Sequence, residues 1–233
     1  MSQRRAASAP RQPRRLGVVV VDPLGIVRAG IGMLVANADG TELLAEAATA
    51  DEALRAIARV RRSRVVVLVG LGLEEPHDAS WLMREIRERY PFHAVLAVGA
   101  NADPTSISRA LFVGADGYVD KRVEPDEFFA SIASVGEREM VLAGPTSGDV
   151  GQIADGIYRR RELDAMLTQR EREVLAVAAE GLTAREIAER LGVRERTVTT
   201  HLGRIYGKLG VGNRLAAVRM AARSGLVSVG TPE

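Results

Sequence analysis

The sequence predicts an α/β protein, a doubly wound parallel sheet of five strands, followed by a small all-α domain with a helix-turn-helix. Between residues 16 and 136, five short apolar runs alternate with helical patterns, which is typical of consecutive βα units. A Gly/Pro/Ser-rich stretch then interrupts the pattern. The last part, from 168 on, has only helical periodicity and helix-start signals.

The expected strands are short and rich in Val. The first, LGVVVVD, is a continuous β-branched run, as expected for a parallel strand covered on both faces. The run TELLAEAA also fits a helix, because Leu, Ala and Glu favour that state. The expected strands span 16–22, 41–48, 65–69, 93–99 and 117–120.

The expected helices between these strands have apolar residues at helical spacing. Asp51 is the expected N-cap of the second helix, Gly114 ends the fourth and Pro125 begins the fifth. In such a fold, sites lie at the carboxyl ends of the strands. The expected helices span 26–37, 51–62, 78–89, 105–113 and 125–136.

Two segments read as connections rather than as parts of a core. Residues 1–15 hold five Arg, no acid and two Pro, and predict a disordered basic arm before a sheet domain at 16–139. Residues 140–166 include GPTSGDVGQ and predict a linker with a possible short helix after that stretch.

Composition excludes several classes of function. The chain has no Cys, which excludes disulfides, thiolate metal sites and a Cys nucleophile, and which suits a cytoplasmic protein. No apolar run approaches the ~20 residues of a membrane helix, and LGVVVV is too short for a signal peptide, so we expect neither membrane contact nor export.

Charge is distributed unevenly along the chain. Residues 16–143 hold 13 basic and 19 acidic residues, whereas residues 168–233 hold 11 basic and 7 acidic ones. An acidic body with a basic C-terminal domain places any contact with nucleic acid at the C-terminal end.

The C-terminal part contains two consecutive capping boxes. Thr168 with Glu171 opens one helix, and Thr183 with Glu186 opens the next. Three further residues, Ala188, Gly192 and Val198, have the spacing of a helix-turn-helix. The small Ala lets the helices approach, Gly takes the positive φ of the turn, and Val packs into the angle between the helices.

The following helix, 194–210, is the expected recognition helix. Its exposed side would be small, polar or basic, and such side chains suit phosphates and base edges in the major groove. The alternative is a solvated helix in an all-α interaction module. The candidate DNA-binding residues are Arg194, Arg196, Thr197, Thr199, Thr200, His201, Gly203, Arg204 and Lys208.

A fourth helix is expected at 213–225, capped by Asn213. Its Leu215, Val218 and Ala222 fit either the core of this domain or a dimer seam.

From Leu167 to about residue 227 the chain closely resembles the LuxR-type helix-turn-helix, and with the sheet domain in front it resembles a response regulator of the NarL/FixJ type. The resemblance implies a flavodoxin-like receiver domain, a DNA-binding domain at 167–229 and a dimer that binds repeats near promoters. It implies base contacts from Thr199, Thr200 and Gly203, and backbone contacts from Arg196 and Thr197. The family often has Lys at positions 199 and 203, and this chain has Thr and Gly.

The phosphorylation pocket that the resemblance implies is incomplete in this chain. Phosphoryl transfer there needs an acceptor carboxylate, an acidic pair for Mg²⁺, a hydroxyl and a Lys. Asp22 remains from the acidic pair, beside Pro23, and Lys121 remains as the Lys. The acceptor falls at Val69 or Gly70 and the hydroxyl at Gly99.

Without an acceptor no aspartyl-phosphate can form, so we expect a regulator that works without it. Asp22 and Lys121 either form an ion pair across the pocket or are solvated separately. Gly70, Gly72 and Gly99 leave room for a ligand, by hypothesis.

The expected function is therefore DNA-binding transcription regulation, with double-stranded DNA and a second copy of the chain as partners. A small-molecule ligand or a heterodimer with another regulator is the alternative. An enzyme is not expected, because no phosphate-binding loop, nucleophile elbow or paired carboxylates stand at the strand ends. No cofactor or metal is expected.

Overall fold

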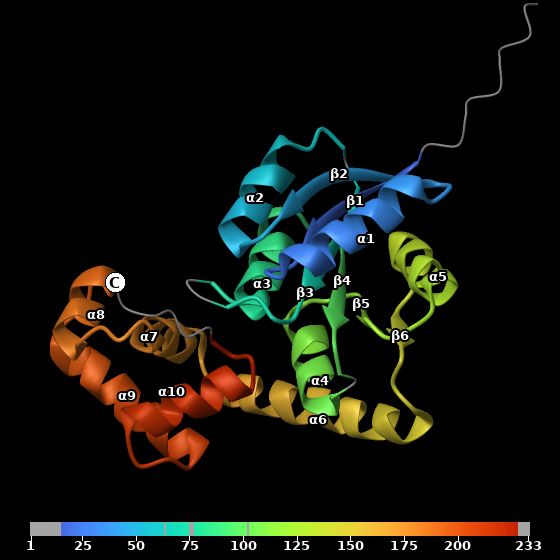
Figure 1. Cartoon of the computed structure of the whole chain (residues 1–233). Coiled ribbons are helices and arrows are strands. Elements are labelled where there is room, and N and C mark those ends of the chain that lie inside the picture. Colours follow the sequence, from blue (N-terminus) through green and yellow to red (C-terminus); the bar gives the residue numbers. More distant parts are fainter. Residues whose placement is uncertain (1–14, 63, 75–76, 102, 228–233) are drawn as a thin grey trace, which may run out of the picture.

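The computed structural model describes residues 15–62, 64–74, 77–101 and 103–227. The expected arm at 1–15 lies outside these residues, apart from Arg15. Figure 1 shows a sheet flanked by helices, a long helix running beneath it, and a helical domain to one side. In the described residues, no helix has the length and apolar character needed to cross a bilayer.

The sheet has six parallel strands in the order β2-β1-β3-β4-β5-β6. The five expected strands are present, and the ambiguous second run is a strand. The strands are β1 Leu16–Val21, β2 Thr41–Ala47, β3 Val66–Gly70, β4 Ala94–Gly99, β5 Gly117–Asp120 and β6 Val141–Ala143. The expectation of five strands is wrong because β6, within the expected linker, pairs with β5 through Gly117 and Val141.

Both faces of the sheet are covered, as its run of Val predicts. Helices α1 and α5 cover one face. Helices α2, α3 and α4 cover the other, together with Ile153, which comes from a later helix, α6 Ser147–Met166. The helices of this domain are α1 Gly25–Asn37, α2 Ala50–Arg59, α3 Ala79–Arg89, α4 Pro104–Val113 and α5 Pro125–Gly136. Thr49 caps α2 by accepting a hydrogen bond from the Glu52 amide, so the expected Asp51 cap is wrong.

The expected linker is mostly one helix of 20 residues, α6 Ser147–Met166. Thr146 and Asp149 form a capping box at its start. Helix α6 packs along α4 at Gly156, where a Cβ atom would approach Ser108 Oγ to 2.5 Å. The connection is therefore a packed helix and not the flexible segment that its composition predicts.

Four helices form the C-terminal domain, with a core of their own. They are α7 Gln169–Ala179, α8 Ala184–Leu191, α9 Glu195–Leu209 and α10 Arg214–Arg223. The turn after α10 lies on the sheet domain, where Arg84 of α3 donates a hydrogen bond to the Gly225 carbonyl. Gly225 has a φ of 73°, and a Cβ there would come within 3.0 Å of Arg109 on α4.

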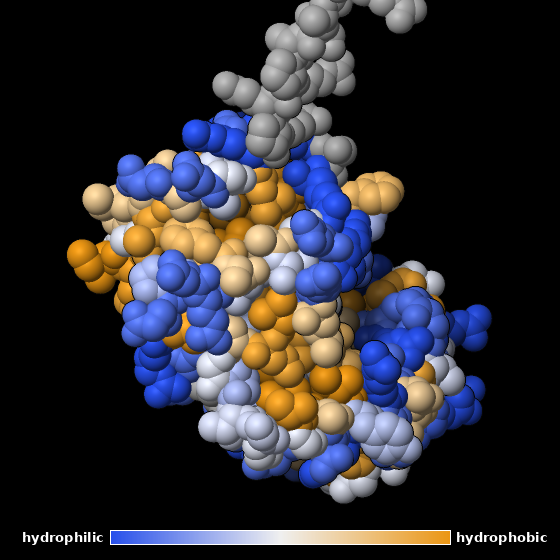
Figure 2. Space-filling view, turned by 90° about the vertical axis from the view of Figure 1, so that its right-hand side faces the viewer, coloured by the Kyte–Doolittle hydropathy of each residue, from blue (hydrophilic) through white to orange (hydrophobic). Residues whose placement is uncertain are grey.

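The side of the molecule that carries α1 and α5 exposes much apolar surface (Figure 2). Ile26 of α1 is 86% exposed, and Leu24, Met33 and Leu34 are also exposed. A groove of about 290 Å³ runs between α1 and the start of α5 on this side. Its lining is Ile26, Val27, Gly30, Ile31, Leu34, Lys121, Val123, Pro125 and Phe128.

Candidate nucleic-acid interface

Helices α8 and α9 form the turn that the spacing predicts. Ala188 is buried, and Gly192 takes the left-handed conformation with a φ of 64°. The Val193 amide donates to the Ala188 carbonyl at 2.9 Å and ends α8. Val198 is fully buried in the angle between the two helices. These contacts hold α9 at a fixed angle to α8.

Helix α9 is strongly amphipathic. Val198, Leu202, Ile205 and Leu209 are buried in the domain core. The opposite side carries most of the candidate DNA-binding residues. Arg194, Arg196, Thr199, Thr200, Gly203 and Arg204 are exposed, and Thr197 is half-buried.

The basic and hydroxyl groups of this face remain open to a partner. In the described part of the chain, Arg194, Arg196 and Arg204 make no ion pair with a carboxylate. Thr199 and Thr200 donate their hydroxyl protons to carbonyls one turn back, at 3.2 and 2.8 Å, which leaves the hydroxyl oxygens as acceptors. The face offers cations for phosphates and small polar groups for base edges.

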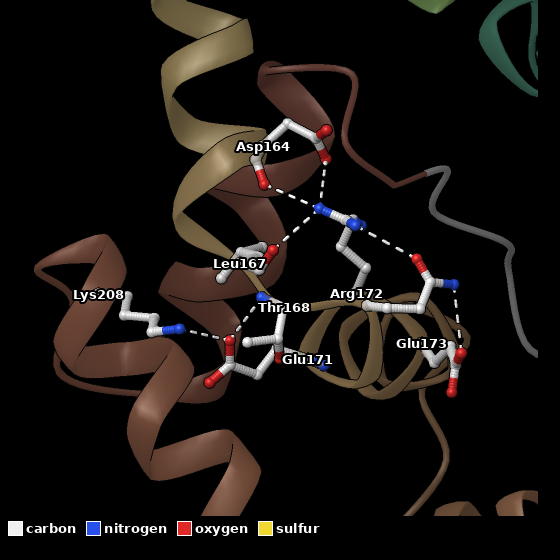
Figure 3. Close-up of polar contacts among 8 residues, drawn as sticks. Asp164, Leu167, Thr168, Glu171, Arg172, Glu173 and Lys208 are labelled. Carbon is white, nitrogen blue, oxygen red and sulfur yellow. Dashed lines mark hydrogen bonds and ion pairs between the residues drawn. The ribbon is translucent and has the colours of Figure 1, made fainter.

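Lys208 differs from the other basic residues of α9. Its ammonium lies 2.6 Å from the buried Glu171 carboxylate of α7 (Figure 3). The Thr168 amide donates to the same oxygen at 2.8 Å and completes the capping box. Burial alone would raise the pKa of Glu171, but the bonds from Lys208 and Thr168 outweigh it and lower that pKa to about 2. Lys208 thus joins α9 to α7, although it remains exposed on the surface of the domain.

His201 is only half-exposed on α9. Its Nδ1 atom is buried and has no hydrogen-bond partner among the described residues. The side chain lies at the border between the core and the open face.

The three residues of the expected dimer seam on α10 differ in exposure. Val218 is buried in the domain core, and Ala222 packs against that core. Leu215 alone is open, at 61% exposed. For Val218 the choice between core and seam is decided in favour of the core.

At the other end of the chain, the strand ends of the sheet bring Asp22 and Lys121 together. The Lys121 ammonium lies 2.6 Å from Oδ2 of the buried Asp22. The Leu24 amide donates to Oδ1 of the same carboxylate at 2.9 Å. Of the two readings of this pair, the ion pair is therefore the correct one.

The position of the missing acceptor is closed by this ion pair. Val69 is fully buried in β3, and Gly70 follows it at the end of that strand. A Cβ atom on Gly70 would lie 2.5 Å from Asp22 Oδ2 and 3.1 Å from the Val21 carbonyl. Because Gly70 has no side chain, the Asp22 carboxylate can lie against it, and this carboxylate fills the space.

The hydroxyl position is closed in the same manner. A Cβ atom on Gly99 would lie 2.5 Å from the hydroxyl of Tyr118, which is fully buried. That hydroxyl donates to the Asn101 carbonyl at 2.9 Å, and burial raises the pKa of Tyr118. The hypothesis that the glycines leave room for a ligand is therefore wrong at Gly70 and Gly99. At Gly72 a Cβ atom would meet only Pro23, at 3.9 Å.

Sequence reasoning missed a second ion pair beside this pocket. Asp120 is buried at the end of β5, and Arg122 binds its two oxygens through Nε at 2.9 Å and Nη2 at 2.8 Å. These bonds from Arg122 lower the pKa of Asp120. The sequence signal is the spacing of Asp and Arg at i and i+2 around the Lys, which is too common to indicate a pair.

Comparison with known proteins gives matches over both domains. Residues 165–221 match the family described as bacterial regulatory proteins, luxR family. The chain is 28% identical to the uncharacterized transcriptional regulatory protein YhcZ of Bacillus subtilis, over 90% of this chain and 96% of that protein. It is also 28% identical to the response regulator protein VraR of Staphylococcus aureus, over 90% of this chain and 98% of VraR.

Among solved structures, RcsB dimers bound to two parallel DNAs have a similar fold. The TM-score is 0.52 at 20% identity, over 90% of this chain and 98% of the RcsB chain. The receiver-like sheet, the luxR-family match and the whole-length relatives agree. The C-terminal domain is thus a luxR-family helix-turn-helix domain, and the chain as a whole is similar to transcriptional regulators of the response-regulator type.

Proposed function

We propose that this regulator binds double-stranded DNA as a homodimer and does so without aspartyl phosphorylation. The observation that carries the proposal is the closed acceptor position. Gly70 supplies no carboxylate, and Asp22 with Lys121 fills the space that an acceptor side chain would need. Without a nucleophile in that place, transfer of a phosphoryl group to this pocket has no acceptor.

The proposed DNA contact is the open face of α9. Arg196 and Thr197 would bind the phosphate backbone, and Thr199, Thr200 and Gly203 would face base edges. Arg194 and Arg204 extend the basic rim at both ends of this face, and His201 lies at its border. Lys208 is left out because Glu171 holds it.

The proposed dimer uses the apolar groove between α1 and α5. Contiguous apolar surface of this kind is uncommon on a monomer and marks a contact site. A two-fold dimer would bury the same groove of both copies. The RcsB structure contains dimers of that protein on DNA, which supports a dimer here. Leu215 of α10 could add a contact between the two DNA-binding domains.

DNA binding is tested by fluorescence anisotropy on the DNA upstream of the protein's own gene, with random DNA as control and no phosphodonor. Arg196→Ala should weaken binding to both DNAs. It should also reduce the slope of the logarithm of the binding constant against the logarithm of the salt concentration by about one. Arg219→Ala, on the exposed side of α10, is the matched control and should change little. If Arg196→Ala binds as tightly as the parent, α9 is not the contact.

The dimer is tested by sedimentation over a concentration series. Ile26→Glu puts a charge into the groove and should raise the dimer dissociation constant at least tenfold. Ala36→Glu is the control, because Ala36 is exposed on the same helix but does not line the groove. A parent protein that stays monomeric, both alone and on its DNA, contradicts homodimerisation and favours a heterodimer partner at this groove.

The alternative of a small-molecule sensor finds little support at the strand ends. Asp22 and Tyr118 occupy the places where Gly70 and Gly99 would admit a ligand. We therefore propose that the strand-end pocket serves as a rigid part of the receiver.

A further inference from the structure

A hollow at the meeting of the two domains lies between α4, α6 and the end of α10. Its volume is about 430 Å³, within the range of pockets that hold small ligands. Three parts of the chain line it: the sheet domain, the connecting helix and the C-terminal domain. The lining residues are Pro104, Thr105, Ser108, Gln152, Asp155, Gly156, Arg159, Arg160, Leu163 and Ser224.

Arg160 is the unusual member of this lining, because it is a cation only 7% exposed. Its Nη1 donates to Ser108 Oγ at 2.9 Å and to the Gly156 carbonyl at 3.0 Å. Its Nη2 donates to the Thr105 carbonyl at 3.1 Å. All three acceptors are neutral.

The charge of Arg160 is thus buried without a counter-charge. In the described residues it forms no ion pair, and its buried Nε–H has no acceptor. Buried charges in proteins are normally paired, since an uncompensated one costs several kcal/mol. By contrast, the half-buried Lys121 at the strand ends is paired with the Asp22 carboxylate.

The surroundings of Arg160 add to this excess of positive charge. Burial lowers the pKa of Arg160, Arg109 lowers it further, Asp103 acts in the opposite direction and Arg159 lowers it again. Arg159 also lines the hollow and is exposed. Asp155 is the one carboxylate of the lining, and it is exposed to solvent.

We infer that this hollow is a binding site for a small phosphate-bearing anion. The anion would compensate the buried charge of Arg160 and accept a charge-assisted hydrogen bond from Arg159. Thr105, Gln152 and Ser224 supply neutral hydroxyl and amide donors around it. The site is separate from the DNA-binding face and from the α1/α5 groove, so it depends on neither part of the proposed function.

A bound anion would touch both domains. Ser224 follows α10, Thr105 lies in the first turn of α4, and the two arginines come from α6. Occupancy would therefore favour the arrangement in which the C-terminal domain lies on the sheet domain.

The test is calorimetric titration of the full-length protein with inorganic phosphate, and separately with pyrophosphate, at constant ionic strength kept with chloride. The expected result is saturable binding at one site per chain. If inorganic phosphate binds and pyrophosphate does not, the natural ligand is free phosphate. If pyrophosphate binds more tightly, the natural ligand is a larger phosphorylated molecule. Heat that does not saturate with either anion overturns the inference.

Three exposed positions on α6 sharpen the test without disturbing the core. Arg159→Gln should weaken binding at least fivefold, and Asp155→Asn should tighten it several-fold by removing a repelling charge. Arg161→Gln is the matched control, because Arg161 is an exposed neighbour that does not line the hollow. Equal weakening by Arg159→Gln and Arg161→Gln would mean nonspecific attraction and would also overturn the inference.

Discussion

At the scale of single residues, the buried Glu171 is a polar group that links two helices of the C-terminal domain. It joins the start of α7, through Thr168, to the end of α9, through Lys208. The capping box is readable from the sequence, because Thr and Glu stand three residues apart. The bond to Lys208 is not readable, because it joins residues 37 positions apart whose approach depends on the packing of α9 against α7.

Replacement of Glu171 by Gln should destabilise the C-terminal domain by roughly 2–3 kcal/mol, given a pKa lowered from 4.5 to about 2. The sign follows from that lowered pKa: the stabilisation is complete above pH 4.5 and is lost as the pH falls towards 2. Hydrogen exchange of the α7 and α9 amides measures it. Glu173→Gln, on the same helix, removes a carboxylate that contacts only the nearby Gln169 and Arg170, and should change exchange much less.

Lys208→Met separates a core role from a DNA-binding role. Exchange in α7 and α9 should accelerate, because Glu171 loses its partner. The salt dependence of DNA binding by the folded protein should stay that of the parent. If the variant is as stable as the parent but its DNA affinity depends less on salt, Lys208 contacts DNA.

At the scale of elements, the sequence predicts the regular units well and the connection between domains poorly. Continuous Val runs and capping boxes are local signals, so β1, β3, α7 and α8 follow from them. Strand β6 has only three residues and depends on pairing with β5. Helix α6 contains Gly148, Gly151 and Gly156, which disfavour a helix in isolation, and packing against α4 decides its state.

Two glycines of α6 should respond oppositely to substitution by Ala. At Gly151 nothing lies within 4 Å of an added Cβ, so Gly151→Ala should stabilise by about 0.5–1 kcal/mol. At Gly156 the added atom would meet Ser108 Oγ at 2.5 Å, so Gly156→Ala should destabilise and loosen α6 from α4. Thermal unfolding of both variants checks the signs. Equal effects would mean that α6 does not lie this close to α4.

At the scale of the whole molecule, the sheet domain has a receiver-like fold, and side chains fill the space beside Gly70 and Gly99 at its strand ends. The sequence identifies which groups of the pocket are missing, because each position can be aligned along the strands. It does not show what fills the space. Asp22 and Tyr118 reach their places from neighbouring strands, and only the three-dimensional register brings them over Gly70 and Gly99.

This closure predicts that the acceptor cannot be restored by one substitution. Gly70→Asp would force its Cβ against Asp22 and the Val21 carbonyl, so the variant should unfold at a lower temperature than the parent. Incubation with acetyl phosphate and Mg²⁺ should leave the intact mass of both proteins unchanged. A gain of one phosphate by the parent would refute the proposed mode of action, and a gain by Gly70→Asp alone would show that the pocket can reopen.

Helix α6 is long enough to act as a strut. Its 20 residues span about 30 Å and are held along α4 for part of that length. In a two-fold dimer, the two α6 helices would fix the distance between the two α9 helices. The dimer would then select DNA by the spacing of its two half-sites as well as by their sequence. Each residue added to α6 would rotate the DNA-binding domain by about 100° and displace it by about 1.5 Å.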